Sequence, residues 1–418
     1  MRITGKLLDE TAAVVTAMLK FDQPADGVLS AHFRAARSGI HDRAFIAETA
    51  YAVLRRRRLL ERLAGVDATP RQLALAALVR LQGCSQRQLA EAVTARELEW
   101  LSAFKAQPEP ELSLAEQTDL PGWLVERLQE RLSADELLAL AHGLNQPAPL
   151  DLRVNALKAG RDEVLARLQA DGFSAAPCRY APFGIRVKGR PSLAKQPLYV
   201  EGAVEVQDEG SQLLALLVAP KRGEMVVDFC AGAGGKTLAL GAMMRSTGRL
   251  YAFDVAEKRL AKLKPRLARS GLSNVHPVLI NGENDAKVKR LAGKIDRVLV
   301  DAPCSGLGTL RRNPDLKWRQ TPAAVTEMTR KQADILTAAA RLLKSGGRLV
   351  YATCSLLAEE NETIVEGFLA AHPEFERLPV TELLAKQGVV IDTGADLHLA
   401  PHTHGTDGFY AAVLERKK

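Results

Sequence analysis

The stretch that most constrains the fold of this chain covers residues 225–237, with the sequence MVVDFCAGAGGKT. Its first five residues form a short apolar run rich in β-branched side chains, which predicts a buried parallel strand. Three glycines crowd the next positions, and the residues from Lys236 onward predict a helix. A strand, a glycine-rich turn and a helix are typical of the first β–α turn of a doubly wound sheet. The sequence therefore predicts a Rossmann-like α/β domain.

Three classes of ligand suit such a turn, and the spacing of its residues separates them. A P-loop needs a glycine five positions before its Gly-Lys-Thr, but Cys230 stands there. The dinucleotide fingerprint needs a third glycine where this chain has Thr237. A nucleoside cofactor without phosphates remains, and S-adenosylmethionine fits because the next strand ends in Asp254, placed to hold ribose hydroxyls. A glycine turn that only packs a helix onto its strand stays open as the structural alternative.

The rest of the C-terminal half alternates predicted strands and helices. Strands are expected at 276–280, 295–300 and 348–353, and polar or reactive residues follow each of them. The residues that follow the three strands are Asn281-Gly282-Glu283, Asp301 to Gly306, and Cys354-Ser355. An open α/β sheet binds its ligands beyond the carboxyl ends of its strands. We therefore expect these groups to line one crevice.

The pattern divides the chain into three predicted domains. Residues 1–145 carry helical periodicity and predict an all-α domain, 146–205 a small β–α–β module, and 206–418 the Rossmann-like domain. The first domain contains four consecutive arginines at 55–58. Two interpretations stay open for them, a solvated helix face and a surface that contacts phosphate groups, because four consecutive residues spread around a helix.

Composition narrows the class of protein. The 57 Lys and Arg exceed the 49 Asp and Glu by eight, which favours a polyanionic partner. No apolar stretch has the length of a membrane span and the N-terminus does not resemble a signal peptide, so we expect a cytoplasmic protein without a membrane partner. The five cysteines show no CxxC or zinc-type spacing, which predicts neither disulfides nor a metal site.

Cys304 and Cys354 follow two strands of the same predicted sheet, so both thiols can face the cofactor crevice. Each alone is typical of a small buried side chain. Together with Asp301 beside a methyl donor they suit methylation at carbon 5 of cytosine. That carbon is too weak a nucleophile until a thiolate adds to carbon 6, and a base must later remove the carbon 5 proton. An acid near ring nitrogen 3 would offset the charge that develops during addition.

At this point the chain resembles the Sun-domain RNA (cytosine-5)-methyltransferases over about residues 146–418. The motifs that carry the resemblance are DFCAGAGGKT at 228–237, DAPCSGLGT at 301–309, RRNPD at 311–315, TCS at 353–355, ENE at 360–362 and DGFY at 407–410. The resemblance implies that Cys354 is the nucleophile and that Cys304 helps to release the product. DNA cytosine methyltransferases use the Pro-Cys cysteine and lack the Thr-Cys one, so the second cysteine indicates RNA.

The resemblance also implies a set of cofactor contacts. Asp254 would hold the ribose, Asp301 would lie beside the methyl donor and the target base, and Glu283 or Asp285 would lie near the adenine. The methionine part would be wrapped by Cys230, Ala231, Gly232, Ala233, Gly234, Gly235 and Lys236. One departure is Gly232-Ala233, where the family usually has Ala-Pro, so this loop is expected to be less rigid.

The N-terminal domain resembles the antitermination-factor-like domain of bacterial small-subunit ribosomal RNA methyltransferases of type B. This implies a monomeric enzyme acting on 16S ribosomal RNA, with the β–α–β module facing the RNA. The target should be an unpaired cytidine, because the base must leave its stack to reach the thiols. The alternatives are the same chemistry on transfer RNA and a non-catalytic RNA-binding assembly factor that keeps the fold.

Overall fold

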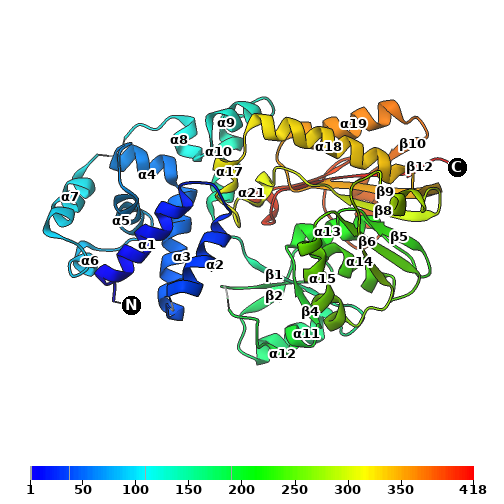
Figure 1. The fold of residues 1–418 in the computed structure, drawn as a ribbon, viewed down its shortest axis with the longest axis horizontal. Helices are drawn as coiled ribbons and strands as arrows, with labels where there is room; N and C mark the ends of the chain where they lie inside the picture. Colours follow the sequence, from blue (N-terminus) through cyan, green and yellow to red (C-terminus); the bar gives the residue numbers. More distant parts are fainter. Residues whose placement is uncertain (1, 37, 109, 190) are drawn as a thin grey trace. The chain divides into compact units, whose positions relative to one another are not determined.

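The computed structural model describes residues 2–36, 38–108, 110–189 and 191–418, and the course of the chain can be followed in Figure 1. They form two compact units. One comprises Met1–Pro147 with Thr309–Pro322, and we call it the helical unit. The other comprises Ala148–Gly308 with Ala323–Lys418, and we call it the α/β unit. The domain boundaries predicted from the sequence stay predictions.

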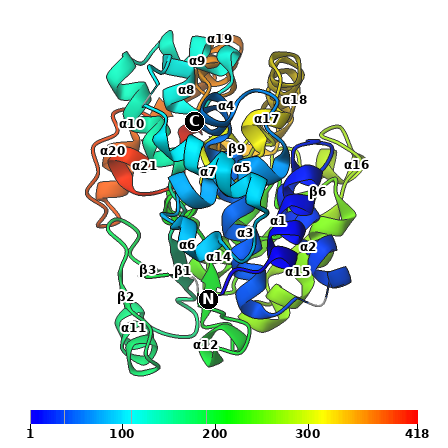
Figure 2. The ribbon, with the colours of Figure 1, turned by 90° about the vertical axis from the view of Figure 1, so that its left-hand side faces the viewer.

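The helical unit is built from short helices around one apolar core. Its helices are α1 (Gly5–Met18), α2 (Ala25–Ala36), α3 (Ile40–Arg55), α4 (Arg57–Ala64), α5 (Pro70–Arg80), α6 (Gln86–Leu89), α7 (Ala95–Ala106), α8 (Leu114–Thr118), α9 (Gly122–Gln129), α10 (Ala134–Asn145) and α17 (Leu316–Arg319). Helices α1, α3 and α5 lie side by side in Figures 1 and 2 and bury side chains such as Leu8, Ile46 and Leu75. The capping box of Ser133 and Glu136 starts α10.

Helix α17 comes from the C-terminal half of the chain but belongs to the helical unit. Its Lys317 is buried, and Lys317 Nζ donates to the carbonyl of Arg55 at 2.8 Å and to Asn145 Oδ1 at 3.2 Å. Trp318 Nε1 donates to the carbonyl of Leu54 at 3.0 Å. Segment 309–322 therefore supplies buried contacts to helices that precede it by more than 150 residues.

The arginines at 55–58 are largely engaged inside the helical unit. Arg55 is buried, and its Nη2 donates to the carbonyl of Arg311 at 3.1 Å. Arg56 Nε lies 2.7 Å from Oδ2 of the buried Asp119. Arg57 pairs with Glu61, one helical turn on, at 2.7 Å. Three of the four side chains therefore already have partners within the unit. This differs from both interpretations given by the sequence, a solvated helix face and a surface that contacts phosphate groups.

The α/β unit begins with a small module whose strands are all antiparallel. Its elements are β1 (Leu150–Val154), α11 (Arg161–Ala170), β2 (Ala175–Pro177), β3 (Gly184–Val187), α12 (Pro197–Val200) and β4 (Val204–Val206), and its sheet has the order β2-β3-β1-β4. Figure 2 shows α11 beside these strands. Val164 and Leu168 of α11 pack with Leu152 and Ile185 of the sheet. The predicted β–α–β elements are present, and two short strands complete the sheet.

The main sheet has the order β10-β12-β9-β8-β5-β6-β7, with β11 paired to β12. Its strands are β5 (Met225–Asp228), β6 (Arg249–Asp254), β7 (Val275–Leu279), β8 (Ile295–Asp301), β9 (Leu343–Thr353), β10 (Phe375–Leu378), β11 (Leu397–Leu399) and β12 (Phe409–Arg416). Strands β5 to β9 run parallel, and β12 is antiparallel to β9. The strand order reverses between β5 and β8, which is the switch point where such sheets bind ligands. The predicted Rossmann-like fold is confirmed.

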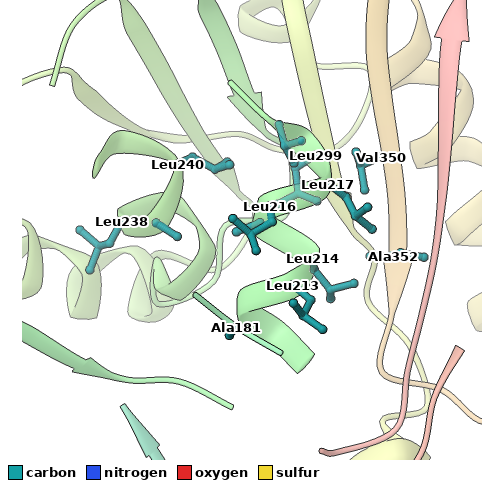
Figure 3. Packing of buried hydrophobic residues seen from close by; sticks show 14 of the residues in the cluster. Ala181, Leu213, Leu214, Leu216, Leu217, Leu238, Leu240, Leu299, Val350 and Ala352 are labelled. Atoms are coloured by element: carbon teal, nitrogen blue, oxygen red, sulfur yellow. The ribbon is translucent and has the colours of Figure 1, made fainter. Parts of the chain in front are cut away.

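Helices cover both faces of the main sheet. They are α13 (Glu209–Val218), α14 (Gly235–Met243), α15 (Glu257–Ser270), α16 (Ala286–Lys289), α18 (Pro322–Ala340), α19 (Glu362–Ala371), α20 (Val380–Ala385) and α21 (Pro401–His404). Figure 3 shows Leu214 and Leu217 of α13 beside Leu299, Val350 and Ala352 of β8 and β9. Ile335 and Leu336 of α18 belong to a separate apolar cluster, with Val298 and Leu349. No helix in the described part of the chain combines the length and apolar character that a membrane crossing requires.

Candidate active site

A cavity of about 850 Å³ lies at the switch point of the main sheet. The carboxyl ends of β5, β6, β8 and β9 meet there, so side chains that are far apart in the sequence converge. The residues predicted from the sequence that line it are Cys230, Ala231, Gly232, Ala233, Gly235, Lys236, Asp254, Glu283, Asp301, Cys304 and Cys354. The structure therefore brings together every predicted site residue except Gly234 and the alternative Asp285.

The two cysteines stand side by side because β8 and β9 are neighbouring parallel strands. Asp301 of β8 pairs in register with Ala352 of β9. Cys304 and Cys354 come shortly after these two residues, so both lie just beyond the carboxyl ends of their strands. Cys304 Sγ lies 3.4 Å from Cys354 Sγ. The hydrogen bond with Cys354, together with burial, holds the pKa of the Cys304 thiol well above its usual range. The two thiols therefore lie within hydrogen-bond distance, and either sulfur can be the donor.

A buried carboxylate holds the two cysteine loops together. Glu360 is fully buried, and its Oε2 accepts hydrogen bonds from Ser305 Oγ at 2.5 Å and from Ser355 Oγ. Its Oε1 accepts from the Ser305 amide at 2.8 Å and from Gln332 Nε2 at 3.0 Å. Since Ser305 and Ser355 directly follow the two cysteines, Glu360 fixes the position of one loop against the other. We call these four residues the Glu360 clamp.

Lys236 and Asp301 form an ion pair at the wall of the cavity, with Lys236 Nζ 2.6 Å from Asp301 Oδ2. Burial by itself would lower the pKa of Lys236, but the charge of the Asp301 carboxylate and its hydrogen bond outweigh burial and raise that pKa. Lys236 thus keeps its positive charge inside the cavity, where it attracts a thiolate. Burial also raises the pKa of the Cys230 thiol well above its usual range.

Comparison with known proteins gives the chain a family. Residues 215–415 match the family described as 16S rRNA methyltransferase RsmB/F, and residues 120–194 match its ferredoxin-like domain. The chain is 39% identical over 308 residues to a probable ribosomal RNA small subunit methyltransferase B of Synechocystis, covering 73% of this chain and 68% of the relative. The chain belongs to the RsmB/F family. The resemblance stated from the sequence motifs is therefore confirmed.

Other similar proteins agree with this RsmB/F membership. A probable ribosomal RNA small subunit methyltransferase B of Bacillus subtilis is 32% identical over 323 residues, covering 76% of this chain and 71% of that one. The crystal structure of PH0851 matches the whole of both chains with a TM-score of 0.80 and 28% identity. A methyltransferase homologue from Pyrococcus horikoshii matches 72% of this chain and 97% of its own, with a TM-score of 0.62 and 28% identity. The RsmB/F chain is an RNA methyltransferase, and its cofactor is S-adenosylmethionine.

The loop after β5 in this RsmB/F chain fits that cofactor. Gly232 has a φ of 56°, and an added Cβ would meet nothing within 4 Å, so the backbone is open towards the cavity. The Gly232 amide donates to Asp254 Oδ2 at 2.7 Å, and the Ala256 amide donates to Asp254 Oδ1 at 2.7 Å. Both oxygens of the Asp254 carboxylate are therefore fixed at the cavity wall. A carboxylate held in this way can accept hydrogen bonds from ribose hydroxyls.

Gly234 does not line the cavity, and its role is to let α15 pack closely. Its φ is 83°, which favours glycine, and a Cβ there would lie 2.2 Å from Leu263 Cδ1. The sequence placed Gly234 among the cofactor-binding residues because it lies within the glycine-rich turn. In the structure, Gly234 is required by its close contact with Leu263 of α15, which lies on the side of the turn away from the cavity.

The two acids proposed for the adenine end are placed differently. Glu283 lines the cavity. Asp285 caps α16 instead, accepting the Lys287 amide at 2.8 Å and the Asn281 amide at 2.9 Å, and these bonds lower its pKa. The geometry therefore favours Glu283 as the acid facing the cofactor. The roles of the predicted site residues stay predictions.

Sequence reasoning missed one wall of the cavity. Met328, Lys331 and Ile335 of α18 line it, at a spacing of three and four residues that places them on one face of the helix. Gln207, just after β4, and Arg259 of α15 line it too. The helical spacing of these three residues shows that they share one face of α18, but no sequence motif indicates that this face lines the cavity.

A group of possible metal ligands lies outside the cavity, where Asp151, Cys178 and Glu209 converge. Arg186 already occupies this group: its Nε lies 2.7 Å from Asp151 Oδ1, and its Nη2 lies 3.3 Å from Glu209 Oε2. Burial raises the pKa of the Cys178 thiol far above its usual range. The guanidinium takes the place that a cation would need.

Proposed function

We propose that the chain methylates carbon 5 of a cytidine in 16S ribosomal RNA. The observation that carries this proposal is the pair of thiols of Cys304 and Cys354, 3.4 Å apart in the cofactor cavity. A methyltransferase that acts on an already nucleophilic atom has no need of two cysteines there. The choice of 16S ribosomal RNA is supported by relatives named ribosomal RNA small subunit methyltransferase B.

The first step assigned to the protein is addition of Cys354 Sγ to carbon 6 of the cytosine ring. The thiol of Cys304 and the ammonium of Lys236 both stabilise negative charge on Cys354, which favours the reactive thiolate. The new sulfur–carbon bond pushes electron density onto carbon 5. We assign to Asp301 the relay of a proton from Lys236 Nζ, 2.6 Å away, to the ring nitrogen, so that the negative charge developing there is neutralised. Bound S-adenosylmethionine supplies the methyl group that carbon 5 then takes.

The second step removes the carbon 5 proton and releases the enzyme. Cys304 is protonated while Cys354 is an anion, because that anion raises the pKa of Cys304. Once Cys354 is bonded to carbon 6 it carries no charge, so Cys304 loses its proton to solvent more easily. The Cys304 thiolate can then accept the carbon 5 proton. The carbon–sulfur bond breaks, its electron pair returns to Cys354 as thiolate, and the ring regains its double bond.

Bisulfite sequencing of RNA from cells with and without the gene tests this proposal, with the Cys354→Ala gene as a control for protein expression. We expect one cytidine of 16S ribosomal RNA to lose its protection from conversion in both the deletion and the Cys354→Ala strain. Loss of protection in transfer RNA alone would move the substrate to transfer RNA. Unchanged protection in all RNA would support a non-catalytic assembly factor.

A further inference from the structure

Helix α15 is the most basic helix that borders the cavity. Its sequence, EKRLAKLKPRLARS, holds six cations and one acid, Glu257. The cations are Lys258, Arg259, Lys262, Lys264, Arg266 and Arg269. The apolar residues Leu260 and Leu263 are buried against the unit. The leucines therefore hold the helix against the unit, and packing in the core does not explain why the cations are arranged as they are.

Five of these six cations share one side of α15. At about 100° per residue, Lys258, Lys262 and Arg259 fall within one stripe about 100° wide, and Lys264 falls on the opposite side with Glu257. Pro265 lies inside the helix, which continues to Ser270, and Arg266 and Arg269 fall in the same stripe and both pair with Glu205. We call Lys258, Arg259, Lys262, Arg266 and Arg269 the α15 stripe.

The α15 stripe runs from the cavity to the small antiparallel module. Arg259 and Arg266 line the cavity that holds both cysteines. At the other end, Arg269 pairs with Glu205 of β4, and its guanidinium lies 4.3 Å from the centre of the Tyr199 ring. A chain of phosphates leaving the cavity in this direction would pass over consecutive cations.

The α15 stripe has far more positive charge than its neighbours neutralise. Among the described residues, Glu205 is the one acid paired with the stripe, which leaves four positive charges. Lys258 and Lys262 are exposed, and neither forms a hydrogen bond or an ion pair within the described part of the chain. Like charges four residues apart on a helix repel each other. The arrangement is therefore unfavourable by itself and would be relieved by an anionic partner.

We propose that the α15 stripe binds the phosphodiester backbone of the RNA next to the target nucleotide. This inference rests on the proposed RNA substrate. Lysine and arginine side chains that neutralise phosphates fix the register of a nucleic acid without reading its sequence. The stripe would hold the strand that flanks the flipped cytidine as it passes from the cavity towards the module.

The test compares two substitutions of equal charge on opposite sides of α15, Lys262→Glu and Lys264→Glu, in the full chain. Binding of a fluorescein-labelled RNA hairpin with cytidines in its loop is measured by anisotropy at several KCl concentrations. We expect Lys262→Glu to weaken binding several-fold and to reduce the slope of log K against log salt by about 1, with about 2 for Lys258→Glu/Lys262→Glu. Lys264→Glu should bind like the unaltered chain.

If Lys262→Glu and Lys264→Glu weaken RNA binding equally, the weakening comes from net charge alone and the proposal is overturned. Unchanged RNA binding by the double variant Lys258→Glu/Lys262→Glu would also overturn it. Calorimetry with S-adenosylhomocysteine and the melting temperature should be unaltered, because neither lysine has a partner within the unit. Methylation of cytidine is assayed separately with the unaltered chain. Salt-dependent binding through the stripe without cytidine methylation would sink only the proposed reaction, while methylation with no effect of the double variant would sink only the stripe.

Discussion

Cys304 Sγ lies 3.4 Å from Cys354 Sγ, although 50 residues separate them in the sequence. The pairing of β8 with β9 sets this approach, and the contact with Cys354, together with burial, raises the pKa of the Cys304 thiol. The proposed mechanism gives the two cysteines different steps, with Cys354 adding to the base and Cys304 assisting release of the product. The substitutions that follow separate their roles.

Replacing the thiols one at a time should give opposite results. Cys354→Ala removes the nucleophile, so methylation and any covalent RNA adduct should both disappear. Cys304→Ala should still allow attack and methyl transfer but leave the product bound to Cys354. Denaturing gels with RNA and cofactor would show a slow, nuclease-sensitive band for Cys304→Ala alone. Cys84→Ala, which removes a thiol of the helical unit, should show neither defect. A band for Cys354→Ala instead would reverse the two assignments.

The Glu360 clamp predicts a loss of rate that is distinct from a loss of fold. Glu360→Ala removes the carboxylate to which the Ser305 amide, Ser355 Oγ and Gln332 Nε2 donate, and each buried donor that finds no other acceptor costs roughly 1–3 kcal/mol. The two cysteine loops would then move apart, so we expect a kcat at least about tenfold lower with little change in the KM for RNA.

Glu360→Gln keeps an oxygen acceptor and should recover part of the lost rate, and Glu366→Ala on the exposed face of α19 is the control. Rates are measured below the melting temperature of each variant, in single turnovers on folded protein. A purely structural role would lower the melting temperature of Glu360→Ala but leave this rate unchanged.

Motifs that lie within one strand and its following turn could be predicted from the sequence. The run before Phe229, the acid at Asp254 and the two cysteines all depend on local patterns, and the topology of parallel strands brings them together. The Glu360 clamp could not be predicted in this way. Its motif was visible, but the donors to Glu360 come from three residues in separate segments, Ser305, Gln332 and Ser355, and only packing determines that they meet there.

Long-range packing also determines the neighbours of residues that local patterns cannot place. Gly234 looks like a ligand-binding glycine until its distance to Leu263 is known. The arginines at 55–58 look exposed because their partners, Asp119 and segment 309–322, are remote in the sequence. Nothing in the periodicity of residues 309–322 indicates that they leave the Rossmann-like sheet and join the helical unit.

The cofactor contact of Asp254 can be tested by binding alone. Asp254→Ala removes a carboxylate that can accept hydrogen bonds from ribose hydroxyls, so affinity for S-adenosylmethionine should fall by about 1.5–3 kcal/mol. Isothermal titration calorimetry on the unliganded chain measures this change. Asp285→Ala should leave the affinity unaltered, because Asp285 caps α16 and does not line the cavity. Equal losses in the two variants would argue against the assignment of the ribose site.

Lys317 gives the helical unit a dependence on pH. Burial lowers the pKa of Lys317 to about 7, against about 10.4 for an unfolded lysine. Between these values the unfolded chain binds a proton that the folded chain has released, so the free energy of unfolding should rise with pH by up to about 1.4 kcal/mol per unit. Below pH 7 both states are protonated, and the cost of burying the charge is fully present.

Calorimetric melting of the unaltered chain and of Lys317→Met from pH 6 to about pH 9.5 isolates this contribution, because the other titrating groups are shared. The variant also loses hydrogen bonds to the Arg55 carbonyl and to Asn145, but that cost does not depend on pH. We therefore expect the melting temperature of the unaltered chain to rise relative to that of the variant above pH 7, and Lys331→Met, at an exposed lysine of α18, to show no such trend. A difference that stays constant across the range would mean that Lys317 remains an ammonium ion inside the unit, held by the negative charge of Asp119.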